Sequence, residues 1–423
     1  MYWLIEDEEQ LSVLINSGYK EAFIEVIPYN NNIHPSINSI SLIYIRPINA
    51  RKGFIVCVTH SECLNALNTR IDALISKFNV LYCRDKKEML HYFPTKALYD
   101  INTPPTTYIR PTTKAHEIIY RKHGDEPDVN LIVPIVKHYE LCEQIFDDLK
   151  ANINLEKTKY NEFFNNTVSL VFNYIERSGI QIHNETFEKH FYPTVDKRVY
   201  TQFNLKTTTT RPSNKFKNVN YAALNKDNGC RKSFIPSNDY LYEIDISSFH
   251  PSLSCRLVDY TFPTVDIHSH LQQLYGVSYE KSKELTFKQL YGGVFDQYRH
   301  IEFFKKIDIY VKELWDEYKS KGEITCPISN FVYKKDTLED MNPQKLFNYL
   351  LQNLETSMNV RILWDMCSIL RKCKTKLVLY TYDSFLFDLD DSEEGILDEI
   401  REVFKKYKLN IKEIKGYDYN FTE

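Results

Sequence analysis

The chain has 423 residues, of which 43% are hydrophobic and 26% are charged. This composition indicates a globular protein of two or three domains and excludes a disordered or fibrous one. No apolar run reaches the length of a membrane span, so we expect no membrane partner. The net charge of −4 gives no general signal for nucleic-acid binding, although a local basic patch can still bind phosphates.

The N-terminus and the cysteines both predict an intracellular protein. Residues 1–9 are acidic and lack the basic start of a signal peptide. The nine cysteines are scattered, odd in number and form no Cys-x-x-Cys pair. This usage predicts reduced thiols, and neither a zinc ribbon nor a disulfide framework.

Residues 1–102 have the pattern of an α/β domain. Short apolar runs predict strands, and one longer periodic segment predicts a helix. The predicted elements are strands at 22–28, 41–46 and 53–58, a helix at 61–78 and a strand at 80–83.

Residues 103–178 are predicted to form a linker followed by helices. The linker is the Thr- and Pro-rich segment 103–107. The helices are expected at 134–150 and 158–178, and Gly179 is a suitable C-terminal cap for the second. From 179 to 423 the pattern is strand, basic loop, strand, helices and hairpin, with further helices expected at 302–321 and 392–406.

The segment 197–232 concentrates positive charge, interrupted only by Asp227. It is also rich in Thr, Ser and Asn, whose side chains contact phosphates in nucleic-acid complexes. A solvated basic loop is the alternative interpretation. The basic residues are Lys197, Arg198, Lys206, Arg211, Lys215, Lys217, Lys226, Arg231 and Lys232.

Two aspartates about 140 residues apart each end an apolar, strand-like run. Asp245 follows the run 240–244, and Pro251 indicates that a helix begins soon after it. Asp383 lies between the runs 377–382 and 385–389, which predicts a hairpin with Asp383 at its tip. A single Asp at a turn is usually structural. Two carboxylates on neighbouring strands, however, can bind a pair of Mg²⁺ ions, as phosphoryl and nucleotidyl transfer require.

Two predicted helices lie between these aspartates in the sequence, and each carries functional side chains on one face. In 278–293, Lys283, Phe287 and Tyr291 are spaced i, i+4, i+8, so they share a face that suits a triphosphate, a sugar and a base. In 348–356, Asn348 and Gln352 share a face that suits hydrogen bonds to a template–primer. Ordinary amphipathic surface helices are the alternative for both segments.

These motifs, in this order over residues 176–423, resemble the family A DNA polymerases, especially the compact bacteriophage versions. Residues 208–214 are similar to the family's Thr-Gly-Arg-x-Ser loop, with Arg211 at the arginine. Asp245 falls on the first metal aspartate, and Tyr382-Asp383-Ser384 takes the place of His-Asp-Glu. The remaining matches are Asp266-Ile267-His268, the helix with Lys283, Phe287, Tyr291 and Gly292, and the helix with Asn348 and Gln352.

The resemblance implies an α+β fold with polymerase palm and fingers over 179–423, preceded by a ribonuclease H-like, exonuclease-like α/β domain. It implies two Mg²⁺ ions held by the catalytic Asp245 and Asp383 and by the Ile246 carbonyl. The substrates would be dNTPs and primer-template DNA. The implied nucleotide-binding residues are Arg211, His250, His268, Lys283, Phe287 and Tyr291. The implied DNA-binding residues are Lys215, Lys217, Arg231, Lys232, Asn348 and Gln352.

Several positions depart from the family pattern. The sugar-selecting Glu of the first motif is His250, which leaves selection between dNTP and rNTP open. The arginine one turn before Lys283 is Tyr279, and Lys281 is the expected substitute. Thr210 replaces a glycine, and Ser384 replaces a glutamate.

Only about thirty residues separate Gly179 from Arg211, where the family has its thumb. We therefore expect a reduced or missing thumb and low intrinsic processivity. The grip on DNA would come from the helices at 134–178, from the N-terminal domain or from a processivity partner protein.

The N-terminal domain is expected to be a degenerate exonuclease. The family's exonuclease needs Asp-x-Glu on its first strand and two further aspartates. Here that strand carries only Glu25, and Asp85 and Asp100 are candidate remnants of the others.

Two alternative functions remain at this point: a related single-subunit RNA polymerase, and a catalytically inactive nucleic-acid-binding protein with the same fold. The compact length and the abundance of Lys, Asn, Ile and Tyr favour a virus with an AT-rich genome. The expected location would then be the cytoplasm of a bacterial host.

Overall fold

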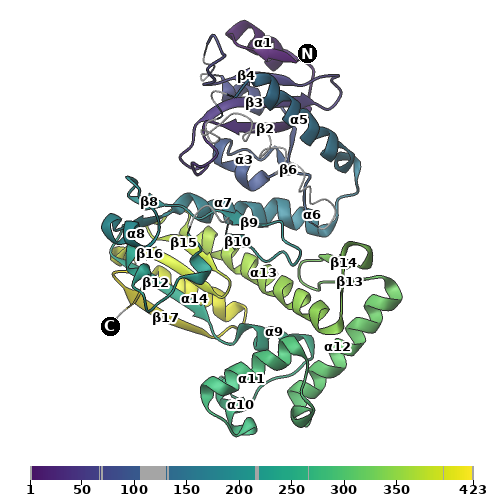
Figure 1. Cartoon of the computed structure of the whole chain (residues 1–423), viewed down its shortest axis with the longest axis vertical. Coiled ribbons are helices and arrows are strands. Elements are labelled where there is room, and N and C mark those ends of the chain that lie inside the picture. Colours follow the sequence, from purple (N-terminus) through teal and green to yellow (C-terminus); the bar gives the residue numbers. More distant parts are fainter. Residues whose placement is uncertain are drawn as a thin grey trace. The chain divides into compact units, whose positions relative to one another are not determined.

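The computed structural model describes residues 2–65, 67, 70–104, 130, 133–214, 219–264, 266–393 and 395–421. The chain divides into two compact units, Met1–Asn173 and Tyr174–Glu423 (Figure 1). In the described part of the chain, no helix has the length and apolar character needed to cross a bilayer.

The first unit is built on a mixed six-stranded sheet in the order β1-β4-β3-β2-β5-β6. β2, β3 and β4 are antiparallel neighbours, while β5 and β6 run parallel to β2. The buried runs of β2 and β3 explain their central position, because both of their faces are covered. The strands are β1 (Trp3–Ile5), β2 (Glu21–Pro28), β3 (Ile40–Pro47), β4 (Phe54–Cys57), β5 (Val80–Cys83) and β6 (Leu98–Asp100).

Helices cover both faces of this sheet. On one face Ile24, Ile43 and Leu81 pack with apolar residues of α1, α2 and α3. On the other face Phe23 and Tyr44 pack against α5. The helices are α1 (Glu8–Asn16), α2 (Ile71–Ser76), α3 (Lys86–Tyr92), α5 (Ile135–Leu149) and α6 (Lys159–Phe163), followed by a π-helical turn (Phe164–Val168) and α7 (Ser169–Ser178).

The observed division differs from the expected boundaries at 102 and 178. The reason is the apolar face of α5, where Ile145 and Leu149 belong to the same core cluster as Phe23 and Tyr44. The helices up to residue 173 therefore belong to the compact unit that contains the N-terminal sheet.

Two local expectations differ from the structure. Of the helix expected at 61–78, the described residues form only α2. Cys57 and Cys63 form a disulfide, so the expectation of reduced thiols is wrong for this pair. The turn after β4 brings their Cα atoms to 6.0 Å, which is within disulfide range. The other seven cysteines, all of which lie among the described residues, form no disulfide.

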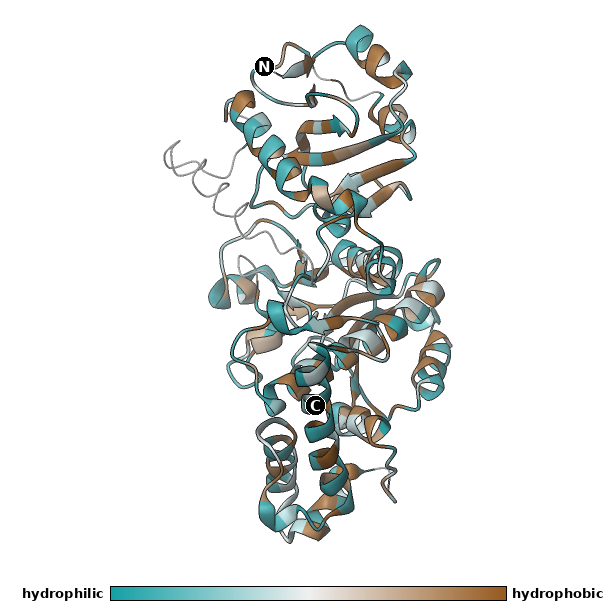
Figure 2. Ribbon diagram, turned by 90° about the vertical axis from the view of Figure 1, so that its right-hand side faces the viewer, coloured by the Kyte–Doolittle hydropathy of each residue, from teal (hydrophilic) through white to brown (hydrophobic). Residues whose placement is uncertain are grey.

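The second unit is centred on a four-stranded antiparallel sheet in the order β15-β16-β12-β17. Strands β12, β15 and β16 are mostly buried, whereas the edge strand β17 exposes most of its residues. Figure 2 colours hydrophobic residues brown. The strands are β12 (Tyr240–Ile246), β15 (Lys376–Thr381), β16 (Ser384–Leu389) and β17 (Ile411–Gly416).

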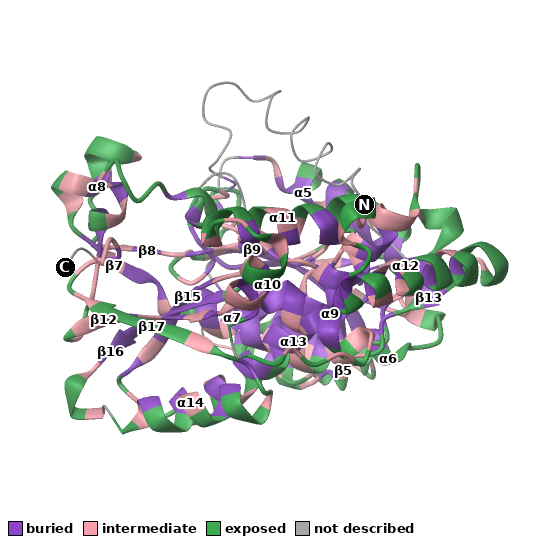
Figure 3. Cartoon of the chain, turned by 90° about the horizontal axis from the view of Figure 1, so that it is seen from below, coloured by how far each residue is buried: buried purple, intermediate pink, exposed green. Residues whose placement is uncertain are grey.

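The long helix α13 (Pro343–Leu370) is the main packing element of this unit. It has contacts with α9 (Phe249–Leu257), α11 (Tyr279–Gly292), α12 (Glu302–Lys321), α14 (Ile396–Lys406) and β15. Residues 353–360 of α13 are all buried, as expected for a helix covered on every side. Figure 3 shows this buried surface on α13 and α9, whereas α12 and α14 expose one face.

Short elements complete the second unit. α10 (Ile267–Tyr275) packs on α11. Between Gly179 and Arg211 the described chain contains a single helix, α8 (Asn184–His190), with β7 (Ile180–Ile182), β8 (Arg198–Val199) and β9 (Phe203–Asn204). This interval therefore has no set of long helices. The remaining strands are β10 (Ser213–Asn214), β11 (Phe234–Ile235), β13 (Glu323–Thr325) and β14 (Val332–Lys334).

Candidate active site

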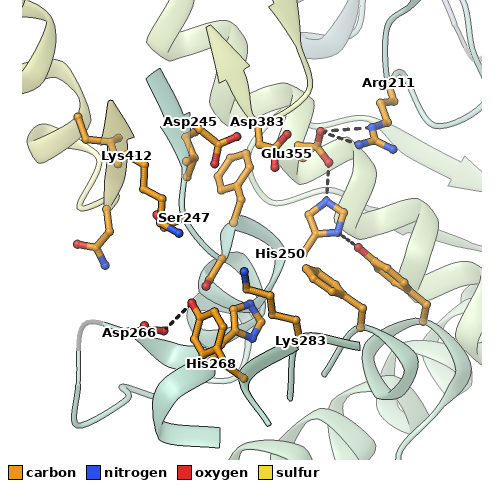
Figure 4. A pocket seen from close by; sticks show the side chains of 18 residues that line it. Arg211, Asp245, Ser247, His250, Asp266, His268, Lys283, Glu355, Asp383 and Lys412 are labelled. Atoms are coloured by element: carbon orange, nitrogen blue, oxygen red, sulfur yellow. Dashed lines mark hydrogen bonds and ion pairs between the residues drawn. The ribbon is translucent and has the colours of Figure 1, made fainter. Parts of the chain in front are cut away.

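The sheet brings Asp245 and Asp383 to one cavity. Asp245 lies near the end of β12 and pairs across the sheet with Ser384, the first residue of β16. The Ile246 N–H donates to the Asp383 carbonyl at 2.9 Å. Figure 4 shows both carboxylates side by side at the top of the cavity, whose volume is about 470 Å³.

One residue directly before Asp383 and one three residues after Asp245 have a left-handed backbone conformation, which is unfavourable for residues with a side chain. Tyr382, before Asp383, has a φ of 60°, and Ser248, which leads into α9, has a φ of 50°. The Asn359 amide donates to the Tyr382 carbonyl at 2.5 Å, and the Arg211 guanidinium lies 3.6 Å from the Tyr382 ring centroid. These contacts fix the turn that presents Asp383.

The negative charges of the Asp245 and Asp383 carboxylates repel each other. Burial raises the pKa of Asp245 to about 7, and the charges of Asp383 and Glu243 add to this effect. Burial also raises the pKa of Asp383. No Lys, Arg or His among the described residues forms an ion pair with either one. Two partly buried carboxylates without an ion-pair partner among the described residues, beside a backbone carbonyl, are a donor set that fits hard divalent cations.

The helix α11 provides the opposite wall of the cavity. Ser278 caps its N-terminus by accepting from the Lys281 N–H, and Gly293, with a φ of 99°, ends it. Lys283, Phe287 and Tyr291 all line the cavity, as the i, i+4, i+8 spacing predicted. The Phe287 and Tyr291 rings are stacked with centroids 5.8 Å apart.

A hydrogen-bonded chain connects this wall to α13 and to the basic loop. The His250 Nδ1 lies 2.5 Å from the Tyr291 hydroxyl, and its Nε2 lies 2.5 Å from Glu355 Oε2. Glu355 Oε1 accepts from Arg211, with the Nη2 at 3.2 Å. Because a carboxylate only accepts, Nε2 of His250 is the protonated nitrogen. The chain fixes Arg211 and His250 in place before any ligand binds.

His268 belongs to the first turn of α10 and lies against α11 as a neutral imidazole. Burial lowers its pKa to about 4, with a further contribution from the Lys283 charge. Its ring contacts Phe287 and Tyr279, with centroids 5.8 and 6.2 Å away. Its Nδ1 is buried and has no hydrogen-bond partner among the described residues.

The residues predicted to bind DNA lie in different segments of the chain and make different contacts. Asn348 donates to the Tyr291 carbonyl at 3.0 Å, and Gln352 accepts from the Thr209 hydroxyl at 2.9 Å, so both position neighbouring segments. Arg231 donates to the Leu224 carbonyl at 3.2 Å and lies 4.8 Å from the Tyr419 ring. Lys232 is exposed. Lys215 and Lys217 lie outside the described residues.

Several cavity residues had no role in the sequence-based prediction, among them Glu355, Ser247 and Lys412. Glu355 lies one turn beyond Gln352, so its position on that face of α13 was a usable signal. Ser247 and Lys412 also line the cavity. Lys412 belongs to a C-terminal strand without a motif, so only the strand pairing reveals it.

Comparison with solved structures identifies a similar fold. One match is the POL domain of Pol1 from M. smegmatis, in complex with DNA primer-template and dNTP. The TM-score is 0.71 at 11% sequence identity, and the match covers 99% of this chain and 100% of that chain. No protein-family model and no curated protein matches the sequence.

The chain therefore has the mixed α+β fold of a polymerase domain from end to end. Because the match includes both compact units, it gives no evidence for a separate exonuclease domain. The ribonuclease H-like, exonuclease-like origin of residues 1–102 stays a prediction.

Proposed function

We propose that the chain is a template-directed DNA polymerase of the family A type, which adds dNTPs to a primer 3′-hydroxyl. The main support is that Asp245, Asp383 and Lys283 line one cavity in a chain with a polymerase-domain fold. The solved structure that it resembles contains DNA primer-template and dNTP, which supports these as the partners.

The proposed cofactor is Mg²⁺, bound by Asp245, Asp383 and the Ile246 carbonyl. When bound, two Mg²⁺ ions would lower the pKa of the primer 3′-hydroxyl and neutralise the triphosphate. Burial is the main reason for the raised pKa of both carboxylates. This rise supports the site, because a divalent cation would stabilise their charged forms.

The side chains of the cavity suit the parts of a nucleotide. Lys283 would stabilise negative charge on the phosphates as it develops, and Arg211 would act near the primer end. Phe287 and Tyr291 offer stacked aromatic surface to the sugar and base. His250, held by Tyr291 and Glu355, would fill the space beside the sugar 2′ carbon, which favours dNTPs over rNTPs.

The N-terminal unit is proposed to lack exonuclease activity. Glu25 is buried and accepts from Arg84 Nη2 at 2.7 Å, so its charge is already neutralised. Asp85 caps α3 by accepting from the Glu88 N–H. Asp100 accepts from the Lys86 and Asn102 N–H groups. All three candidate acids thus have structural roles. Mg²⁺-dependent degradation of a 3′-labelled single strand, lost in Asp85→Ala, would contradict this proposal.

The short interval between Gly179 and Arg211 supports a reduced thumb and low processivity. In a single-turnover extension with trap DNA, we expect the lone chain to add only a few nucleotides before it dissociates. Addition of tens of nucleotides per binding event would contradict the proposal.

We further propose a bacteriophage source and an intracellular site of action, on the basis of the compact length of the chain and its composition.

The experiment that tests the function is primer extension with and without Mg²⁺, run separately with dNTPs and rNTPs. We expect extension that depends on Mg²⁺ and on dNTPs. Preferential use of rNTPs would favour the single-subunit RNA polymerase alternative. Binding of primer-template DNA without extension under any condition would favour the inactive nucleic-acid-binding protein.

A further inference from the structure

Lys412 lies beside the candidate metal carboxylate on the edge strand of the central sheet. β17 pairs with β12 so that Lys412 is the direct partner of Asp245. Side chains of directly paired residues project from the same face of a sheet. At the start of this strand the Ser247 N–H donates to the Asn410 carbonyl at 2.8 Å. Lys412 therefore faces the cavity from a fixed backbone (Figure 4).

The Lys412 ammonium has no carboxylate partner within ion-pair distance among the described residues. Its charge nevertheless acts on two groups of the cavity: it offsets part of the rise that burial causes in the pKa of Asp245, and it adds to the lowering that burial causes in the pKa of His268. Lys283 also lowers the pKa of His268. The two lysines, one on the sheet and one on α11, thus direct positive charge to the same region around His268.

The cation expected to assist Lys283 is not available. Lys281 forms an ion pair with Glu284 at 2.8 Å on the exposed side of α11 and does not line the cavity. Tyr279, at the position of the family's arginine, offers a ring face 4.5 Å from the Lys283 Nζ instead of a charge. His268, with its pKa of about 4, is uncharged at neutral pH. Arg211, another cation that lines the cavity, is paired with Glu355 at 3.2 Å. Among the described residues, a triphosphate beside Lys283 would therefore lack a second unpaired cation unless the sheet provided one.

We propose that Lys412 is the second triphosphate-binding cation, which contacts phosphate oxygens of the incoming dNTP and of the leaving pyrophosphate from the sheet side. This inference rests on the proposed function. It makes phosphate binding partly independent of α11, because one of the two cations belongs to the strand next to Asp245.

The test compares Lys412→Ala with a matched control on the same strand. Lys415 is three residues further along β17, so it projects from the opposite face, where it pairs with Asp391 at 3.1 Å. Equilibrium dialysis with Mg²⁺ would measure the affinity for dATP and for dAMP. For Lys412→Ala we expect about tenfold weaker dATP binding and unchanged dAMP binding, since a charge-assisted contact to the terminal phosphates is lost. Lys415→Ala should bind both as the wild type does, and Lys412→Arg should restore most of the dATP affinity.

Primer extension and pyrophosphorolysis provide a second readout. Lys412→Ala should raise the KM for dNTPs and for pyrophosphate by about tenfold. Unchanged dATP affinity in Lys412→Ala, equal losses for dATP and dAMP, or no dATP binding by the wild type would each overturn the inference. If the wild type binds dATP but extends no primer, the proposed polymerase function fails, and the dialysis result still decides the role of Lys412.

Discussion

Replacing Asp245 by Asn is expected to stabilise the metal-free protein. In the folded state the pKa of Asp245 is about 7, compared with an ordinary value of 3.8. A difference of about three pKa units corresponds to about 4 kcal/mol. Because the side chain retains contact with solvent, screening reduces this to about 1–2 kcal/mol. For a unit of about 250 residues, this corresponds to an increase in Tm of about 2–8 °C.

The stability difference between the wild type and Asp245→Asn is expected to depend on pH. Between pH 4 and pH 7 the folded state binds a proton at Asp245 that the unfolded chain has released, so wild-type stability falls as the pH rises. Asp245→Asn lacks this titration. The difference in Tm between the two proteins should therefore be small near pH 4 and reach its full value above pH 7.

The assay is thermal unfolding in EDTA at several pH values, followed by addition of Mg²⁺. Mg²⁺ should raise the Tm of the wild type more than that of Asp245→Asn. Asp316→Asn is the control, because Asp316 is exposed on α12 and forms a surface ion pair with Lys319; its effect should stay within about 0.5 kcal/mol. A lower Tm for Asp245→Asn than for the wild type at pH 8 in EDTA would refute the reasoning.

Two other substitutions test the polar contacts of each unit. Arg84→Ala should lower the free energy of unfolding of the first unit by about 3–5 kcal/mol in urea titrations, because Glu25 would stay buried without its partner; a loss below about 1 kcal/mol would contradict this. Glu355→Ala should reduce the rate of primer extension by about tenfold to a hundredfold, because it removes the shared partner of His250 and Arg211. An unchanged extension rate in Glu355→Ala would show that this network has no positioning role.

Much of the second unit could be predicted from local sequence patterns. The strand before Asp245, the hairpin at Asp383 and the capped helix with Lys283 are all present, since each has local signals such as apolar runs, an N-cap or a glycine stop. The common face of Lys283, Phe287 and Tyr291 follows from helical periodicity alone.

Other features depend on tertiary contacts that a local pattern does not contain. The proximity of Lys412 to Asp245 depends on the pairing of β17 with β12, which are more than 150 residues apart. The role of Glu355 depends on two other segments, those with His250 and Arg211, that meet at its carboxylate. Similarly, the assignment of α5 to the N-terminal unit follows from packing on Phe23 and Tyr44, and not from its own sequence.

The most direct test of the shared metal site is Mn²⁺ binding measured by electron paramagnetic resonance in the presence of dATP. The wild type should bind two ions, and Asp245→Asn and Asp383→Asn should each lose both, because the two carboxylates form one site. If each variant retains one ion with wild-type affinity, or if the wild type binds none, the two aspartates do not act together and the proposed catalytic centre is contradicted.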